Sequence, residues 1–317
     1  ANPRFLPATK ELLNRLYALW GHWTLSGQSN PISGLDRYTT RMQQICGEWP
    51  AVWAADFGFS ADRNGDDYIG DRDGILDEVE RQSRAGSLIQ LDFIPANPVI
   101  GEPCNGQDLV DRISDRDWEA MLTPGTSVFT RWRTQLAIIA VYLRYLKDMG
   151  IVVLFHPCPA MNSRRWWWGD RSGPAGYAGL WRSIFDHYVH DLHLDNLLWV
   201  WSAESGGADP VDFYPGHHMV DILGCDCFPD AMSGNGPERL SMADWNRLLK
   251  LAEGRPLALT RTDFIPDDSS LTRQRWLWFT VARSSWEACH HPEDVRVLYA
   301  GSHLLHRKDW REPHLAR

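Results

Sequence analysis

Eight short apolar runs alternate with helical patterns along this chain, and that alternation restricts the fold more than any other feature. Most runs are nearly continuous in apolar residues, which is typical of strands covered on both faces. They span residues 22–28, 51–59, 87–94, 151–158, 196–203, 220–228, 256–264 and 295–301. Helical stretches such as RWRTQLAIIAVYLRYLKDMG lie between most of them. Strand and helix alternating eight times predict an α/β fold, a (β/α)8 TIM barrel.

Length and charge limit the class of protein. The 317 residues fit one barrel domain over residues 1–317. A net charge of −9 argues against nucleic acid or an anionic membrane surface as the main partner, because both would repel the chain. No apolar stretch reaches the roughly 18 residues of a membrane span, and ANPRFLP has no signal-like pattern. We expect a monomer without membrane insertion, secreted or periplasmic, whose signal peptide is not part of this chain.

Polar side chains follow the predicted strands, at the end of the barrel where active residues lie in this architecture. These positions are Gln28, Asp56, Asp92, His156 through Asn162, Glu204, Asp226, Asp263 and His303. His156 could donate to a ligand, but a histidine inside a barrel strand is more often a satisfied core group. The His217–His218 pair precedes a strand, so we expect it on the opposite face, in a structural or solvent-exposed role.

Tryptophan is the abnormal residue type, with 17 in 317 residues. Indole rings suit the C–H faces of sugars, although many simply fill cores. Trp166, Trp167 and Trp168 follow the fourth predicted strand, directly after Arg164 and Arg165. Three adjacent indoles cannot all face one core, so we predict that at least one forms a sugar platform.

Cysteine usage gives no disulfide framework. The six residues are scattered, at Cys46, Cys104, Cys158, Cys225, Cys227 and Cys289. Cys225 and Cys227 share one face of a predicted buried strand. We interpret them as core residues, because no partners for a zinc site can be identified.

Three motifs follow one another in the chain: FHPCPAMNSRRWWWG, YAGLWRSIF and NLLWVWSAES. In this order and spacing they resemble glycoside hydrolase family 26, which includes the β-mannanases. The fourth strand of that family typically reads like FRPLHEMNGGWFWWG, followed by a YxxLWR helix and a strand like NLLWVYSP. The similarity covers most of the chain. It implies a barrel whose cleft holds a polysaccharide or oligosaccharide and which requires no cofactor, with Gln28 and Asn162 as retained hydrogen-bonding positions.

The resemblance also implies departures at the reaction centre. The acid/base glutamate of the family falls at Ala160, and the nucleophile glutamate, after PLALT, falls at Arg261. A family histidine falls at Pro159, the tyrosine that supports the nucleophile at Phe228, and a third-strand histidine at Ile94. Retaining glycosidases need two carboxyl groups roughly 5 to 5.5 Å apart. Ordinary mannanase chemistry is therefore not expected from this set of residues.

Several explanations of these departures stay open. The leading hypothesis is a diverged hydrolase, in which Glu204, Asp226 or Asp263 supplies a carboxylate from another strand end. A second is a pseudoenzyme that binds carbohydrate without cutting it. A third is an engineered Glu→Ala change at position 160, which would explain that position alone. A polysaccharide lyase is a further alternative, for which no convincing base is found.

The replacements predict a more basic cleft. Arg261 would add a positive charge near Arg164 and Arg165, and a guanidinium pairs in bidentate fashion with a carboxylate. This favours an acidic, uronate-bearing polysaccharide over neutral β-mannan. The alternative is that Arg261 pairs with Asp263 or Glu204 and fills the space of the lost glutamate.

The loop DRNGDDYIGDRD, residues 62–73, is similar to a calcium-binding loop. Asp62, Asn64, Asp66 and Asp73 stand at positions one, three, five and twelve. Asp67 stands at the sixth position, where glycine normally makes the sharp turn. Structural calcium and a solvated acidic loop are the two interpretations.

Overall fold

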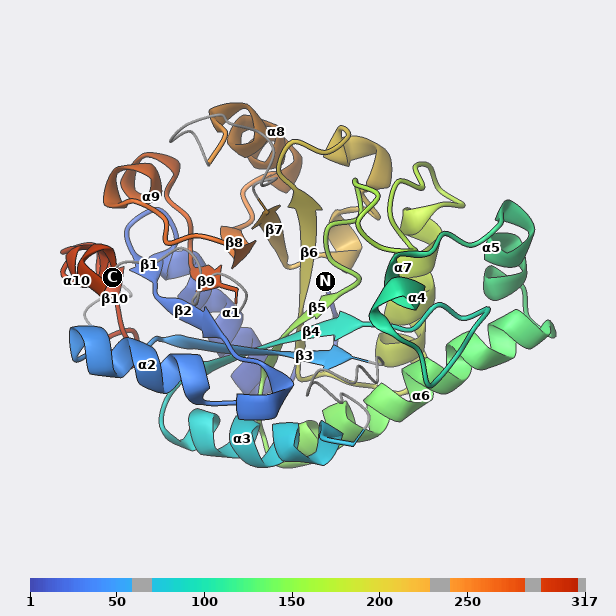
Figure 1. The fold of residues 1–317 in the computed structure, drawn as a ribbon, viewed down its shortest axis with the longest axis horizontal. Helices are drawn as coiled ribbons and strands as arrows, with labels where there is room; N and C mark the ends of the chain where they lie inside the picture. The colour runs from blue at the N-terminus through green and yellow to red at the C-terminus, as the bar shows by residue number, and fades with distance from the viewer. Residues whose placement is uncertain (59–69, 229–239, 283–291, 313–317) are drawn as a thin grey trace.

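The computed structural model of the chain describes residues 1–58, 70–228, 240–282 and 292–312. Eight parallel strands close into a barrel in the order β2 to β9 (Figure 1). They are β2 Gly27–Ser29, β3 Val52–Gly58, β4 Leu88–Ile94, β5 Val153–Pro157, β6 Leu197–Glu204, β7 Ile222–Cys227, β8 Leu257–Thr262 and β9 Phe279–Val281. A separate parallel pair joins β1 (Thr24–Leu25) to β10 (Leu304–Leu305). The predicted (β/α)8 architecture is confirmed.

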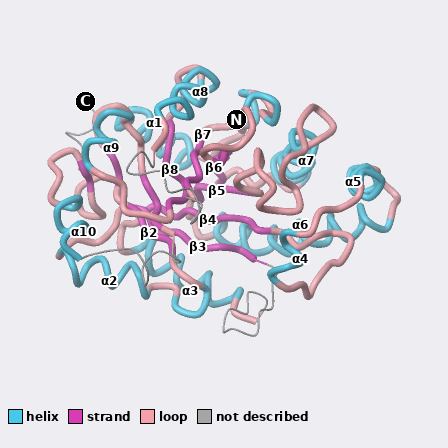
Figure 2. The backbone as a smooth tube through the Cα atoms, turned by 45° about the horizontal axis from the view of Figure 1, so that its top comes forward, coloured by secondary structure: helices cyan, strands magenta, loops and turns pink. Residues whose placement is uncertain are grey.

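Helices surround the strands (Figure 2). They are α1 Pro7–Leu19, α2 Arg37–Cys46, α3 Arg72–Arg84, α4 Gly106–Val110, α5 Asp115–Leu122, α6 Ser127–Asp148, α7 Tyr177–Phe185, α8 Met242–Ala252, α9 Asp268–Gln274 and α10 Pro292–Tyr299. Short turns of helix are η1 Ile32–Gly34, η2 Asp186–Asp191, η3 Pro210–Phe213 and η4 His217–Met219, of which η2 is a π-helix. Within the described ranges, no helix is long and apolar enough to cross a membrane.

Local sequence sets the ends and the buried face of the helices. Thr126 caps α6, since its hydroxyl accepts a hydrogen bond from the backbone N–H of Phe129 at 3.0 Å. Trp132 and Leu136, one turn apart on α6, are both fully buried. Gly47 ends α2 with φ 79°, a left-handed conformation that glycine adopts without a steric cost.

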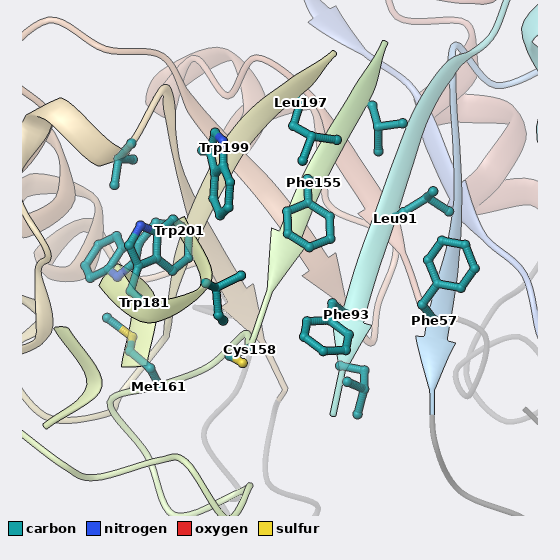
Figure 3. Packing of buried hydrophobic residues seen from close by; sticks show 14 of the residues in the cluster. Phe57, Leu91, Phe93, Phe155, Cys158, Met161, Trp181, Leu197, Trp199 and Trp201 are labelled. Atoms are coloured by element: carbon teal, nitrogen blue, oxygen red, sulfur yellow. The ribbon is translucent and has the colours of Figure 1, made fainter. Parts of the chain in front are cut away.

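Successive strand residues face either the helices or the barrel interior. The outer face contributes aromatic residues such as Phe57, Phe93, Phe155 and Trp199 to the large core between strands and helices (Figure 3). A second apolar cluster joins strand residues to α1 and includes Leu16, Leu19, Leu88, Leu154 and Leu198. Because most of these strand residues lie at the starts of their strands, α1 closes the amino-terminal end of the barrel. The polar strand ends lie at the opposite end.

Two predicted strands differ from the structure. Residues 295–299 of the predicted eighth strand belong to α10, and β9 closes the barrel instead. Val295, Leu298 and Tyr299 are buried while Val297 is 64% exposed, which is helical spacing. The three residues of β9 are too few to show a periodic pattern. The predicted first strand, residues 22–28, is divided between β1 and β2.

Candidate active site at the carboxyl-terminal end of the barrel

Strand register brings most of the predicted site residues together at the barrel mouth. Asp56 of β3 lies opposite Asp92 of β4, and Asp92 lies opposite His156 of β5. On the other side, Glu204 of β6 lies opposite Asp226 of β7. Four carboxylates and an imidazole therefore surround the carboxyl-terminal end of the barrel, where active sites of this fold lie.

A β-bulge in β8 adds Arg261 to this group. Cys225 pairs with Leu259, but the next residue, Asp226, pairs with Arg261, which leaves one extra residue in β8. An extra residue changes the direction of the following side chains. The Arg261 Nη1 lies 3.5 Å from Asp56 Oδ1 and 3.4 Å from Asp92 Oδ2.

These contacts revise the prediction of a basic cleft. We considered Asp263 or Glu204 as partners of Arg261; the structure shows ion pairs of Arg261 with Asp56 and Asp92. Glu204 is paired with Arg165 instead. Arg165 and Arg261 are therefore paired with carboxylates of the barrel mouth. They do not give the mouth the excess of positive charge that we expected.

His156 is the centre of a buried hydrogen-bonded chain. Its Nδ1 lies 2.9 Å from Asp92 Oδ1 and its Nε2 lies 2.7 Å from Ser202 Oγ. Gln90 also donates to Asp92 Oδ1, at 2.9 Å. Ser202 donates to Asp226 Oδ2. The imidazole is fully buried and hydrogen-bonded on both nitrogens, which favours the interpretation of His156 as a core group.

Within this hydrogen-bonded group, His156 and Asp92 stabilise each other's ionised forms. Burial acts to lower the pKa of His156, but Asp92 and Asp226 outweigh burial and raise that pKa above its ordinary value. Burial would raise the pKa of Asp92, but His156 and Arg261 outweigh it and hold that pKa below its usual range. The geometry is that of a buried ion pair.

Asp226 lies beneath the mouth and is fully buried. Besides Ser202, its carboxylate accepts hydrogen bonds from Thr260 Oγ1 at 2.7 Å and from the backbone N–H of Ala160 at 3.0 Å. Burial raises its pKa above the usual range, against the opposing effects of His156 and of these hydroxyl groups. Asp226, which we predicted as a candidate catalytic carboxylate, thus contacts the backbone of residue 160.

The loop after β5 is held in an unusual conformation. Cys158 and Ala160 have φ of 51° and 54°, a left-handed region that is unfavourable for residues other than glycine. Tyr177 donates to the carbonyl of Cys158 at 2.9 Å. Asn162 donates to the carbonyl of Ala208 at 2.8 Å and accepts from the backbone N–H of Glu204 at 2.7 Å. Asn162 therefore links the loop after β5 to the end of β6 and the residues that follow it. Its side chain is only 3% exposed, so it is not open to a ligand.

Glu204 and Arg165 form a second polar group at the mouth. Arg165 donates through Nε and Nη2 to the two carboxylate oxygens of Glu204, at 3.0 and 2.6 Å. Ser163 also donates to this carboxylate. The Arg165 guanidinium carbon lies 4.2 Å from the centre of the Phe228 ring. The predicted catalytic residue Glu204 is thus committed to an ion pair.

The three adjacent tryptophans have different surroundings. Trp167 and Trp168 are fully buried and donate to the carbonyls of Pro95 and Pro159, at 3.0 and 2.9 Å. Trp166 is partly exposed and stacks on Trp168, with ring centres 5.2 Å apart. A sugar platform formed by this group would therefore have to be Trp166. Arg164, predicted beside them, has a mostly exposed side chain that is paired with Asp170.

Gln28, predicted as a hydrogen-bonding position, is buried, and His303 does not lie at the mouth as predicted. Gln28 is fully buried and its amide donates to the carbonyls of Ser29 and Val281. His303 precedes β10, whose partner β1 leads into the amino-terminal end of a barrel strand, and it pairs with Asp268. The placement of His303 failed because the predicted eighth strand is a helix.

Other predictions concern residues away from the mouth. His217 and His218 are exposed in η4, directly before β7, so their expected position at the other end of the barrel is confirmed. Cys225 and Cys227 are buried in β7, as expected of core residues, with their sulfur atoms 3.6 Å apart.

Most of the predicted calcium loop lies outside the described residues. Asp62, Asn64 and Asp66 belong to residues 59–69, and Asp73 lies in the first turn of α3. Elsewhere, across the described ranges, no group of three or more histidine, cysteine or carboxylate side chains is arranged to hold a metal ion.

Ser202, Thr260 and Gln90 are site residues that sequence reasoning missed. Gln90 and Ser202 stand two residues before Asp92 and Glu204 on their strands. The two-residue period of a strand would have placed them on the same face. Thr260 carried no such signal, because the bulge changes the alternation in β8.

Comparisons with known proteins agree with this fold. The sequence model of the family described as Glycosyl hydrolase family 26 matches residues 1–309 of this chain. A mannan endo-1,4-beta-mannosidase of Bacillus subtilis is 30% identical over 254 residues, which are 74% of this chain and 68% of that protein. The solved structure of GH26A from Muricauda sp. MAR_2010_75 has a TM-score of 0.88 at 29% identity, covering 98% of this chain and 99% of that chain. A beta-mannanase from a symbiotic protist of the termite Reticulitermes speratus, solved with gluco-manno-oligosaccharide, shares the fold, with a TM-score of 0.81 at 21% identity over 97% of this chain and 96% of that chain.

Proposed function

Because the chain belongs to glycosyl hydrolase family 26, a family of glycoside hydrolases, we propose that its barrel mouth takes a mannan-type polysaccharide. We further propose that the chain cleaves this polymer far more slowly than a member with both family glutamates, since Ala160 and Arg261 occupy their positions. The substrate class rests on the relative named a mannan endo-1,4-beta-mannosidase. A polymer cannot cross a membrane, so the protein would act outside the cytoplasmic membrane.

The arrangement of Ala160 and Arg261 around Asp226 is the observation that supports this proposal. The backbone of Ala160 donates to Asp226, and Arg261 is the strand partner of Asp226. The two positions that the resemblance assigns to glutamates therefore adjoin the same buried carboxylate. Neither residue can act as a general acid or as a carboxylate nucleophile, and a retaining hydrolase needs both functions.

The other carboxylates of the mouth are poor substitutes for the missing pair. Asp92 and Asp226 are buried within the chain around His156. Asp56 is paired with Arg261, and Glu204 is paired with Arg165. Asp263 is partly buried just after β8 and acts to raise the pKa of Arg165, which puts it within electrostatic range of the mouth. We propose that residual cleavage uses Asp263, the carboxylate that follows the carboxyl-terminal end of β8.

A non-catalytic polysaccharide-binding protein is the second candidate. The ion pairs of Glu204 and Asp56 favour it, because they would order the mouth but leave these carboxylates unavailable for catalysis. A lyase is less well supported, because abstraction of a proton needs an accessible base. His156, the imidazole at the mouth, is fully buried and hydrogen-bonded on both nitrogens.

Product analysis on β-mannan tests the proposal with the natural chain, Ala160→Glu, and the double variant Ala160→Glu/Arg261→Glu. Ala160→Gln is the matched control, since it has the same shape without an acid. We expect slow cleavage by the natural chain, loss of that cleavage in Asp263→Asn, and at least a hundredfold gain in the folded double variant, because general acid catalysis alone contributes about 10²–10⁴-fold. Binding of manno-oligosaccharides without cleavage by any variant would favour the second candidate. Absence of both binding and cleavage would refute a mannan-type ligand.

A further inference from the structure

We infer that Arg165, stacked on Phe228 and held by Glu204, forms a binding platform for a neutral sugar ring and discriminates against uronates. This inference rests on the proposed function, because the ligand is one unit of the polysaccharide proposed above. It names the residue that selects the ligand, and it replaces the earlier hypothesis that the arginines of the mouth attract acidic sugars.

The guanidinium of Arg165 is fixed in one plane. Its Nε and Nη2 each donate to one carboxylate oxygen of Glu204, which is a bidentate pair. One face of the group lies 4.2 Å from the centre of the Phe228 ring. Ser163 donates to the same carboxylate and also accepts from the backbone N–H of Arg165. Contacts to one edge of the guanidinium, to one of its faces and to the backbone N–H thus fix the arginine. Little conformational entropy is therefore lost when a ligand binds.

The side chain of Arg165 is partly accessible, and one of its nitrogens has no partner among the described residues. The side chain of Arg165 is 32% exposed, whereas that of Glu204 is 11% exposed. Within the described part of the chain, Nη1 of Arg165 has no hydrogen-bond partner. A planar group with free N–H donors can stack under a sugar ring or donate to its hydroxyl oxygens.

The surrounding charges favour a neutral ligand. Arg165 is neutralised by Glu204, and Arg261, whose guanidinium carbon is 5.8 Å from the Phe228 ring centre, contacts Asp56 and Asp92. Around the mouth the cationic groups Arg165, Arg261 and His156 face the four carboxylates of Asp56, Asp92, Glu204 and Asp226. A uronate would bring a further negative charge towards an already negative group, and like charges repel each other.

Calorimetry with a manno-oligosaccharide and a mannuronate oligosaccharide of equal length tests the inference. Arg165→Met keeps the length of the side chain but removes its charge and donors, and we expect about tenfold weaker binding of the neutral ligand. Arg165→Lys keeps the charge without the planar fork, so it should also weaken binding. Arg164→Met is the matched control, because this neighbouring arginine is mostly exposed and paired with Asp170, and it should bind as the natural chain does.

Glu204→Gln provides the decisive contrast. It removes the charge that neutralises Arg165 and one acceptor of the bidentate pair, so we expect the affinity for the uronate ligand relative to the neutral ligand to rise about tenfold. Unchanged neutral binding in a folded Arg165→Met protein would overturn the platform. Preference of the natural chain for the uronate would overturn the selectivity. If the natural chain bound neither ligand, the proposed function itself would fail, which is a separate result.

Discussion

At the scale of single residues, hydrogen-bond directions determine the charge of His156. Ser202 has one proton, which it donates to the carboxylate of Asp226, so it must accept from Nε2 of His156. The other nitrogen donates to the carboxylate of Asp92. With Asp92 and Asp226 both ionised, this pattern makes both nitrogens of His156 donors, which is the hydrogen bonding of an imidazolium ion and agrees with its raised pKa. This buried cation compensates two buried carboxylates.

The stability of the fold should depend on pH through His156. Its pKa is raised in the folded state, so its stabilisation is complete below the ordinary histidine pKa of about 6.5 and is lost as pH rises through the folded value. The pKa of Asp92 is lowered, so its contribution is present above about 3.9 and lost in acid. We expect a maximum free energy of unfolding between these limits and a decrease above pH 7, measured by urea denaturation across pH. The alkaline decrease should be smaller in His156→Gln and unchanged in the exposed control His218→Gln. An equal slope in all three proteins would contradict this role.

At the scale of elements, two irregularities shape the mouth. The bulge in β8 directs Arg261 towards Asp56 and Asp92. The left-handed turn through Cys158 and Ala160 follows β5, and tertiary hydrogen bonds hold it in place. Such conformations cost about 1–3 kcal/mol each and persist where the surroundings fix them.

Asn162 should be essential for the order of this turn. Asn162→Ala removes its bonds to Ala208 and to the backbone of Glu204, and leaves buried backbone groups unsatisfied. We expect a loss of about 2–4 kcal/mol in the free energy of unfolding and faster proteolysis within residues 158–163. Asn14→Ala, on the exposed face of α1, is the control and should change stability by less than about 0.5 kcal/mol. A stability of Asn162→Ala close to that of the control would show that the turn does not need these hydrogen bonds.

At the scale of the whole molecule, the two ends of the barrel differ in composition: one is apolar and the other is charged. Apolar side chains and α1 fill the amino-terminal end, whereas ion pairs occupy the carboxyl-terminal end. This division is typical of the fold, in which the core and the site are built on the same strands.

The calcium prediction for residues 62–73, most of which lie outside the described residues, concerns the stability of the whole molecule. If this loop binds calcium, added Ca²⁺ should raise the melting temperature by several degrees, because a ligand that binds the folded state stabilises it. Excess chelator should reverse the shift, and Asp62→Asn/Asp66→Asn should not respond. A melting temperature that does not change with chelator would refute structural calcium and leave a solvated acidic loop.

The sequence alone determined the barrel, because covered strands and amphipathic helices leave local patterns of apolar residues. It also determined which polar residues end the strands, so Asp56, Asp92, His156, Glu204 and Asp226 were found. It failed where a strand is too short to show a pattern, as in β9, and it misplaced His303 as a result. Tertiary structure alone decided which charges meet. Arg261 contacts Asp56 and Asp92 through strand register and a bulge, which depend on contacts between residues far apart in the chain. Burial also decided the roles of Gln28, Trp167 and Trp168, since a sequence pattern does not show what covers a side chain.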